Sequence, residues 1–185
     1  MQAEERFDET ISRAREGHRD ALERIYRELH PPILRYLRAL ETSEAEDLAS
    51  EVWLDVITNL DRFTGDERGF RAWAFTIARS RLVDLRRRRS RQATSPASPE
   101  ELDRPDRTGD VEEEALAGLA TEEALRQIAS LSHDQAEVVL LRVLGGLEVR
   151  EVAAIVDKRP GTVRVLQHRA LRRLAQQVTR VEVTE

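Results

Sequence analysis

The sequence contains no cysteine, only 4% aromatic residues and no long apolar run. The absence of cysteine excludes disulfide scaffolds, thiol nucleophiles and cysteine-ligated zinc or iron–sulfur sites. No apolar stretch approaches the roughly 18 residues that indicate a membrane span, and the N-terminus shows no secretion signal. We therefore expect a soluble, cytoplasmic protein. The length of 185 residues suits one ordinary domain or two small ones.

A net charge of −5 conceals strong segregation along the chain. Residues 1–70 carry ten basic and seventeen acidic side chains, whereas residues 71–91 carry eight arginines and one acid. Residues 92–157 carry five basic and fifteen acidic side chains, and residues 158–185 carry seven basic and two acidic ones. Fields act over about a Debye length, roughly 8 Å at physiological salt, so local patches matter more than the total. Solvated helix faces would explain either basic segment alone, but two of them favour a polyanion touched at two places.

Apolar residues recur at helical spacing through most of the chain, and no sustained β-type alternation occurs, so we predict an all-α fold. Pro31-Pro32 interrupts one apolar stripe, which resumes afterwards. Ser43 and Ser132 each precede a Glu or Gln by three residues, and this capping-box spacing predicts helix starts. A further helix is expected over about 70–89, and its predicted inward residues are Trp73, Ile77 and Leu85.

Residues 90–110 change in composition. They contain three prolines together with Ser, Thr and Asp, and few large apolar side chains. Such a segment cannot bury enough surface to order itself, which predicts a flexible, acidic linker. The linker divides the chain into two small helical domains, residues 1–89 and 111–185.

The end of the chain has the pattern of a helix-turn-helix. A short helix over about 149–156 and a turn at Asp157–Arg159 precede a longer helix that starts near Pro160. On a wheel at 100° per residue, one side carries Val163, Gln167, Ala170, Leu171 and Leu174. The other side carries Arg164, Val165, His168, Arg169 and Arg172. This outer set offers guanidinium groups to phosphates and guanine edges, although a plain helix pair with a basic face is the alternative.

Two stretches together resemble the extracytoplasmic-function (ECF) class of bacterial RNA polymerase sigma factors. Region 2 of that class is similar to AEDLASEVWLDVITNLDRFTGDERGFRAWAFTIARSRLVDLRRRR, and region 4 is similar to LSHDQAEVVLLRVLGGLEVREVAAIVDKRPGTVRVLQHRALRRLA. The order of the two stretches and the proline-bearing linker make the resemblance specific. It implies a transcription initiation subunit that binds core RNA polymerase, recognises −35 and −10 promoter elements and assists promoter melting. The implied partners are promoter DNA, the β′ and β subunits and, as is frequent in the class, a cognate anti-sigma factor.

The resemblance also implies a polymerase-binding helix. Asp47, Leu48, Glu51 and Val52 match positions that in this class bind the coiled coil of the β′ subunit. Asp55 extends the acidic row that Asp47 and Glu51 begin at four-residue spacing, although ordinary helix solvation would explain such a row equally well.

The resemblance assigns the −10 element to a loop and the helix that follows. Arg62, Phe63 and Thr64 match the loop that receives a base flipped out of the element, and Phe63 is either its aromatic wall or a core plug beneath it. The residues assigned to phosphates near the melted strand are Arg71, Arg79, Arg81, Arg86 and Arg87. Ser80 replaces the usual Asn of the class, and Trp73 is expected in the core rather than against a base.

The resemblance assigns the −35 element to the outer face of the last helix. The matching positions are Thr162, Arg164, Val165, His168, Arg169 and Arg172. Leu166 and Gln167 stand where the class commonly has Arg and an apolar residue, so the preferred −35 sequence is expected to be unusual.

Other chemistries have little support. The four histidines are scattered, and neither a Gly-rich phosphate loop nor a nucleophile–base arrangement is present, so we predict no metal, no cofactor and no independent catalysis. One alternative is a freestanding helix-turn-helix regulator that binds an operator as a dimer, which leaves the first half unexplained. Another is a helical adaptor whose arginines only confer solubility.

Overall fold

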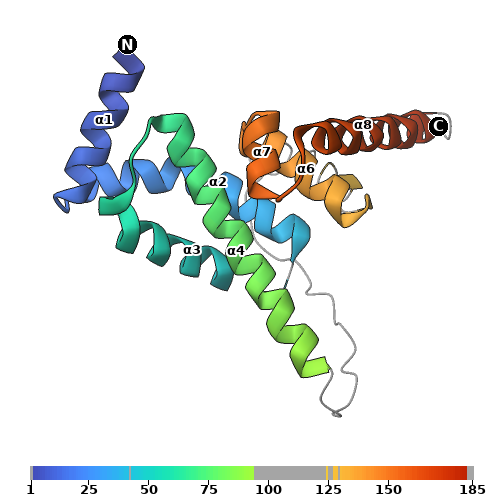
Figure 1. Ribbon diagram of the computed structural model, residues 1–185, viewed down its shortest axis with the longest axis horizontal. Coiled ribbons are helices and arrows are strands. Elements are labelled where there is room, and N and C mark those ends of the chain that lie inside the picture. The colour runs from blue at the N-terminus through green and yellow to red at the C-terminus, as the bar shows by residue number, and fades with distance from the viewer. Residues whose placement is uncertain (1, 42, 94–123, 125–126, 129, 183–185) are drawn as a thin grey trace.

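Figure 1 shows a computed structural model of the chain, in which residues 2–41, 43–93, 124, 127–128 and 130–182 are described. The N-terminal unit contains α1 (Gln2–Arg15), α2 (Arg19–Leu40), α3 (Ala45–Asn59), the 3-10 turn η1 (Leu60–Arg62) and α4 (Glu67–Ala93). The C-terminal unit contains α6 (His133–Val143), α7 (Val149–Ile155) and α8 (Pro160–Glu182). No strand occurs among the described residues, and the two helical units confirm the predicted all-α class.

The four helices of the N-terminal unit enclose one apolar core. Phe70 and Phe75 of α4 are 1% and 0% exposed and are among its largest buried side chains. Leu85 is buried as predicted, whereas Trp73 and Ile77 are only partly buried at the edge of the core. The inward face of α4 is therefore rotated from the predicted one toward the two phenylalanines.

Helix α2 runs through Pro31 and Pro32 without a break, contrary to the predicted interruption. A proline in a helix interior removes an amide donor and costs about 3 kcal/mol. The buried stripe nevertheless stays in register, with Leu29 before the prolines and Ile33 and Leu37 after them at 4%, 0% and 0% exposed. Each such side chain contributes about 1.5–3 kcal/mol on burial, so packing on both sides of the prolines outweighs the local cost.

The two predicted capping boxes are not formed. Glu44, not Ser43, is the N-cap of α3, and it makes no side-chain cap. Ser132 lies at the N-cap of α6 as predicted, but its hydroxyl caps no amide. A capping box does form at the start of α7, where the carboxylates of Glu148 and Glu151 each accept a backbone N–H.

The C-terminal unit confirms the predicted helix-turn-helix. Helix α7 ends at Ile155, Asp157 adopts a φ of 53° in the turn, and α8 begins at Pro160. Val163 and Ala170 are both fully buried on the inner face of α8, which packs against α6 and α7. The long second helix is thereby held with its opposite face outward.

Helix α4 continues to Ala93, four residues beyond the predicted domain boundary at residue 89. The rest of the predicted linker, residues 94–110, and the following residues 111–123 lie outside the described residues. The linker therefore stays a prediction. Within the part of the chain that the structure describes, no helix has the length and apolarity needed to cross a bilayer.

The two units contact each other. Helix α2 packs against α6, and α4 packs against α7. Figure 1 shows α6 and α7 on the same side of α4. Since α4 also carries the predicted −10 residues, this contact bears on the candidate site.

Candidate nucleic-acid interface and partner surface

The loop between η1 and α4 is held in shape by local contacts. Gly65 has a φ of +147°, and a Cβ there would lie 3.1 Å from Cζ of Phe63, so glycine lets the ring sit against the loop. Asp66 accepts the backbone N–H three residues ahead at 2.7 Å and so caps α4. Arg15 of α1 donates to the carbonyls of Leu60 and Phe63, which are 45 and 48 residues away. Sequence reasoning missed Arg15 because no local spacing signals so distant a partner.

An open hollow of about 640 Å³ lies between α3, this loop and α4. It is lined by Asp55, Asn59, Arg62, Phe63, Thr64, Trp73 and Ile77. Phe63 is only 8% exposed and stacks on Trp73, with ring centroids 5.3 Å apart and planes at 30°. The structure thus brings the three predicted loop residues together. It also places Trp73, expected in the core, in the wall of the hollow.

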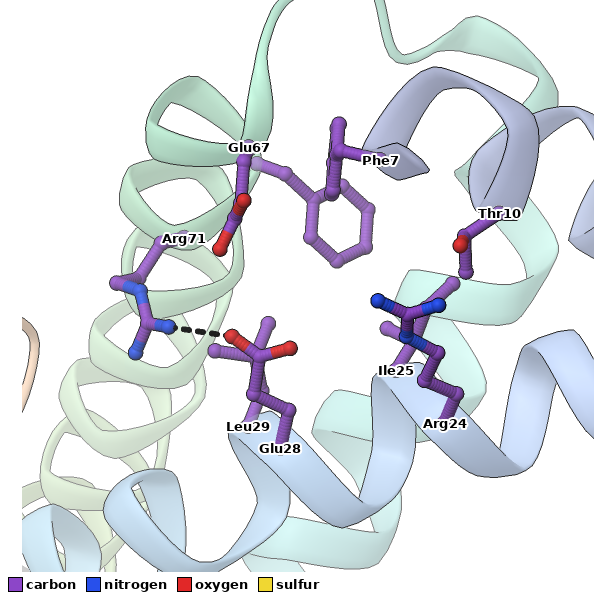
Figure 2. Close-up of a pocket in the computed structure, with 9 residues that line it drawn as sticks. Phe7, Thr10, Arg24, Ile25, Glu28, Leu29, Glu67 and Arg71 are labelled. Carbon is purple, nitrogen blue, oxygen red and sulfur yellow. Dashed lines mark hydrogen bonds and ion pairs between the residues drawn. The ribbon is translucent and has the colours of Figure 1, made fainter. Parts of the chain in front are cut away.

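The predicted arginines of α4 are engaged within the protein. Arg71 donates to Glu28 of α2 at 2.8 Å, and Figure 2 shows the two side chains facing each other beside a small cavity. Arg87 lies 3.9 Å from Asp84 one helical turn earlier and is otherwise exposed. Ser80 is also exposed. The ion pairs of Arg71 and Arg87 lie at the surface, where such a pair contributes about 0–1 kcal/mol to stability. Another anion could therefore replace the carboxylate partner at low cost.

Arg79 and Arg86 reach across to the C-terminal unit. Arg79 Nε donates to Glu137 Oε1 at 3.0 Å, and the Tyr36 hydroxyl donates to the same oxygen at 3.2 Å. Burial, reinforced by the charge of Glu137, raises the pKa of Tyr36 well above its usual value. Arg86 lies 2.6 Å from Nε2 of His133, and burial, with the charge of Arg86, lowers the pKa of this imidazole.

The predicted polymerase-binding residues of α3 divide into exposed and buried ones. Asp47 is exposed, while Glu51 and Asp55 both accept hydrogen bonds from Arg81 of α4, Asp55 through two bonds of 2.6 Å. The predicted contacts of Leu48 and Val52 need correction, because these residues are 4% and 0% exposed. Their side chains pack in the core and cannot reach a partner while α3 is folded onto it.

Two exposed apolar residues on α3 were missed. Leu54 and Ile57 are 65% and 53% exposed, and both fall off the inward stripe of the helix, which is the signal that could have identified them. Ile57 borders an apolar groove of about 500 Å³ between α2 and α3, together with Tyr26 and Trp53. Such a groove is suited to the apolar face of a partner helix, and Glu23 and Arg27 of α2 also line it.

The predicted −35 face of α8 is exposed along its whole length. Its members are Thr162, Arg164, Val165, His168, Arg169 and Arg172. Leu171 was predicted to face inward but is 50% exposed, because it follows the outward Arg164 by seven residues, or nearly two full turns. Among the described residues, the three arginines of this face are bonded to no other side chain, and no cluster of His, Asp or Glu could hold a metal ion.

Two family models match the chain in the order in which its two units occur. Sigma-70 region 2 matches residues 25–92, and Sigma-70, region 4 matches residues 121–174. The first covers most of α2 to α4, and the second covers the helix-turn-helix. Together they define a sigma-70-type transcription factor. A freestanding helix-turn-helix regulator is not favoured, because it would leave the region 2 match unexplained.

Similar curated proteins show to which class of sigma factor the chain belongs. The ECF RNA polymerase sigma factor ShbA of Streptomyces griseus is 37% identical over 173 residues, which cover 89% of this chain and 91% of that protein. The ECF RNA polymerase sigma factor SigD of Mycobacterium tuberculosis is 35% identical over 182 residues, covering 94% and 84%. The chain therefore belongs to the ECF class of RNA polymerase sigma factors.

Solved structures share the fold. The sigma factor RpoE, in its complex with the anti-sigma factor NepR from Bartonella quintana, matches with a TM-score of 0.64 at 23% identity, covering 85% of this chain and 96% of that chain. CnrH, in its complex with the cytosolic domain of CnrY, matches with a TM-score of 0.62 at 19% identity, covering 92% and 95%. At these identities the likeness concerns the fold alone.

Proposed function

We propose that the chain binds core RNA polymerase, reads −35 and −10 promoter elements and helps to separate the strands at the −10 element. The observation that supports this most is the presence, in one chain, of an exposed basic face on α8 and an aromatic-walled hollow beside α4. The polymerase carries out the chemistry, so the chain needs no catalytic group or cofactor of its own. Its place of action is the cytoplasm, where polymerase and promoter DNA are found.

The outer face of α8 suits the major groove. A recognition helix presents several side chains to base edges and flanking phosphates, and Arg164 and Arg169 supply guanidinium groups for both. The hollow suits an extruded base, because flipping costs a few kcal/mol of stacking that contact with Trp73 would partly restore.

The polymerase surface is proposed on α3. Asp47 and Glu51 offer charge, and the neighbouring Leu54 and Ile57 offer apolar area. The proposed occupant is the β′ coiled coil, and the β subunit is a further proposed partner. An anti-sigma factor is a further proposed partner, since RpoE and CnrH are seen in complexes with NepR and CnrY.

The test is run-off transcription with purified core polymerase and a genomic promoter library. We expect association with core enzyme and transcripts from a defined subset of promoters. Core enzyme that fails to retain the chain would refute the sigma function. Retention without any promoter-specific transcript would refute the promoter assignment but not the polymerase surface.

A further inference from the structure

Helix α1 is fixed to the N-terminal unit by its apolar face. Ile11 and Ala14 are each 4% exposed in the core of that unit. Phe7, one turn before Ile11, contacts the ring of Phe70 on α4 with the ring centroids 5.8 Å apart. Figure 2 shows Phe7 projecting from α1 toward a small cavity beside the start of α4. Arg15 follows Ile11 by four residues, so this packing also fixes the place from which its side chain extends.

Arg15 joins α1 to the loop that precedes α4. Its Nε donates to the carbonyl oxygen of Leu60 at 3.3 Å, and its Nη2 donates to the carbonyl oxygen of Phe63. The planar guanidinium group is suited to this task because it presents several donors in a fixed fork. The Leu60 carbonyl also accepts the backbone N–H of Phe63 at 3.2 Å. One side chain therefore holds both ends of this short turn.

The residue that Arg15 holds is also the one that supports the hollow beside α4. The ring of Phe63 packs edge-on against Phe70 at 5.0 Å and stacks on Trp73 at 5.3 Å. A bond that fixes the carbonyl of Phe63 also limits the movement of its ring, which backs the indole. Helix α1 thus contacts the start of the loop through Arg15, and it contacts Phe70, just beyond the end of the loop, through Phe7.

We propose that Arg15 is a positioning residue for the −10 element, which keeps the loop in the shape that accepts an extruded base. This role rests on the proposed function of the hollow. The side chains that line the hollow do not include Arg15, so it acts through Phe63 and not on the base itself. If the loop leaves this shape in part of the molecules, the apparent dissociation constant of the base rises in inverse proportion to the fraction that keeps it.

Hydrogen–deuterium exchange tests the positioning in the free chain. Arg15 is exposed, so Arg15→Ala leaves the core intact while it removes both donors. The amides of residues 60–66 should then exchange about threefold faster or more. Arg15→Lys keeps the charge but replaces the fork with a single ammonium group, so its increase should be smaller. The matched control is Arg13→Ala, which removes the same charge from an exposed pair with Asp20 and should leave this exchange unchanged.

The effect on DNA is measured by fluorescence anisotropy, with holoenzyme and a −10 single strand from a promoter that the chain transcribes. Each base in turn is replaced by an abasic site, and the ratio of the two dissociation constants gives the contribution of that base. The extruded base should contribute about 5- to 150-fold in the wild type, and Trp73→Leu identifies it by lowering that ratio. Arg15→Ala should lower the same ratio about threefold or more, while the strand that is abasic at this position binds with unchanged affinity. A general loss of charge would weaken both strands alike.

Three results would overturn the proposal. Equal exchange of residues 60–66 in Arg15→Ala and Arg13→Ala would show that Arg15 does not hold the loop. Faster exchange with an unchanged base ratio, or with equal weakening of the intact and the abasic strand, would show that recognition of the base does not need the held shape. A wild-type ratio near one at every position would refute the hollow as a base site, and the role of Arg15 would fall with that part of the proposed function.

Discussion

At the scale of single residues, the hollow beside α4 depends on two stacked rings. Phe63 is nearly buried and supports Trp73, whose partly buried indole forms a wall. Phe63 thus has both positions that the sequence allowed, while its contact with a flipped base stays a prediction. It lines the hollow and also fills the space beneath the loop.

Replacement of Trp73 tests the hollow. Trp73→Leu removes a stacking surface that contributes about 1–3 kcal/mol per base, so holoenzyme should bind a −10 single strand roughly 5- to 150-fold more weakly. Trp73→Phe keeps an aromatic face and should retain most of the affinity. Fluorescence anisotropy measures both. Equal affinity for the wild-type, Leu and Phe chains would exclude Trp73 from base contact.

The stability of the folded protein should depend on pH through His30. Its Nδ1 accepts the Trp53 indole N–H at 3.0 Å, and burial, with the charge of Arg38, lowers its pKa. The unfolded chain then binds the proton at a higher pH than the folded one. Stability from this group is therefore complete above about pH 6.5 and falls as the pH drops through the unfolded and folded pKa values. His133 shifts in the same direction.

The measurement is the free energy of unfolding in urea between about pH 7.5 and 5.5. Wild type should lose more stability on acidification than His30→Gln, since His133 is common to both chains. A larger loss in the variant would contradict the assignment.

At the scale of elements, one face of α3 packs in the core and the opposite face is the one that we propose binds polymerase. Leu48→Ala removes buried methyl groups and should cost about 2–5 kcal/mol of unfolding free energy. Leu54→Ala lies on the surface and should change stability by about 0.5 kcal/mol or less, yet weaken binding to core polymerase. Urea unfolding and a core-binding assay distinguish the two. Unchanged core affinity in Leu54→Ala would exclude the exposed face of α3 as the docking surface.

A second prediction at this scale concerns helix α8. Arg164→Ala and Arg169→Ala should each cost about 1–3 kcal/mol of −35 binding, and that binding should weaken steeply with salt. The control is Arg19→Ala, which removes the same charge from an exposed pair with Glu23 on α2. If both α8 variants bind duplex DNA like the control, α8 is not the recognition helix.

Prediction from sequence succeeded where apolar residues recur at helical spacing over many residues. It failed where a single contact determines the local structure. The helix-turn-helix follows from the turn residues and from an apolar stripe that predicts both faces of α8 correctly apart from Leu171. The continuity of α2 across Pro31 cannot be predicted from local sequence, because tertiary packing overrides the local cost of proline. The roles of Ser43 and Ser132 as caps were mispredicted because spacing alone does not set the direction of a hydroxyl.

At the scale of the whole molecule, the site depends on contacts that no local pattern encodes. Arg79 and Glu137 are 58 residues apart, and Tyr36 and Glu137 are 101 apart. The charge segregation in the sequence indicates where the basic surfaces lie. It does not indicate that acidic side chains of the same protein pair with the arginines of one of these surfaces. Family resemblance predicts promoter-contacting residues, but it does not predict that two of them, Arg79 and Arg86, contact the C-terminal unit.

Salt should therefore expand the free protein. Raising NaCl from about 50 to 500 mM screens the exposed Arg68 pairs and favours separation of the units. A chain whose size was set only by repulsion within the acidic residues 92–157 would contract instead. Small-angle scattering measures the radius of gyration, and contraction on adding salt would contradict a contact between the units that depends on these pairs.

The unbroken length of α4 has a consequence for the DNA that we propose it binds. Arg71, Arg79 and Arg86 lie within about a quarter turn of one another around the helix, and fifteen residues separate the first from the last. At 1.5 Å per residue they span about 22 Å, which is the rise of six to seven nucleotides at about 3.4 Å each. A single rigid helix would thus act as a ruler, setting how many nucleotides of the promoter strand are held between its two ends.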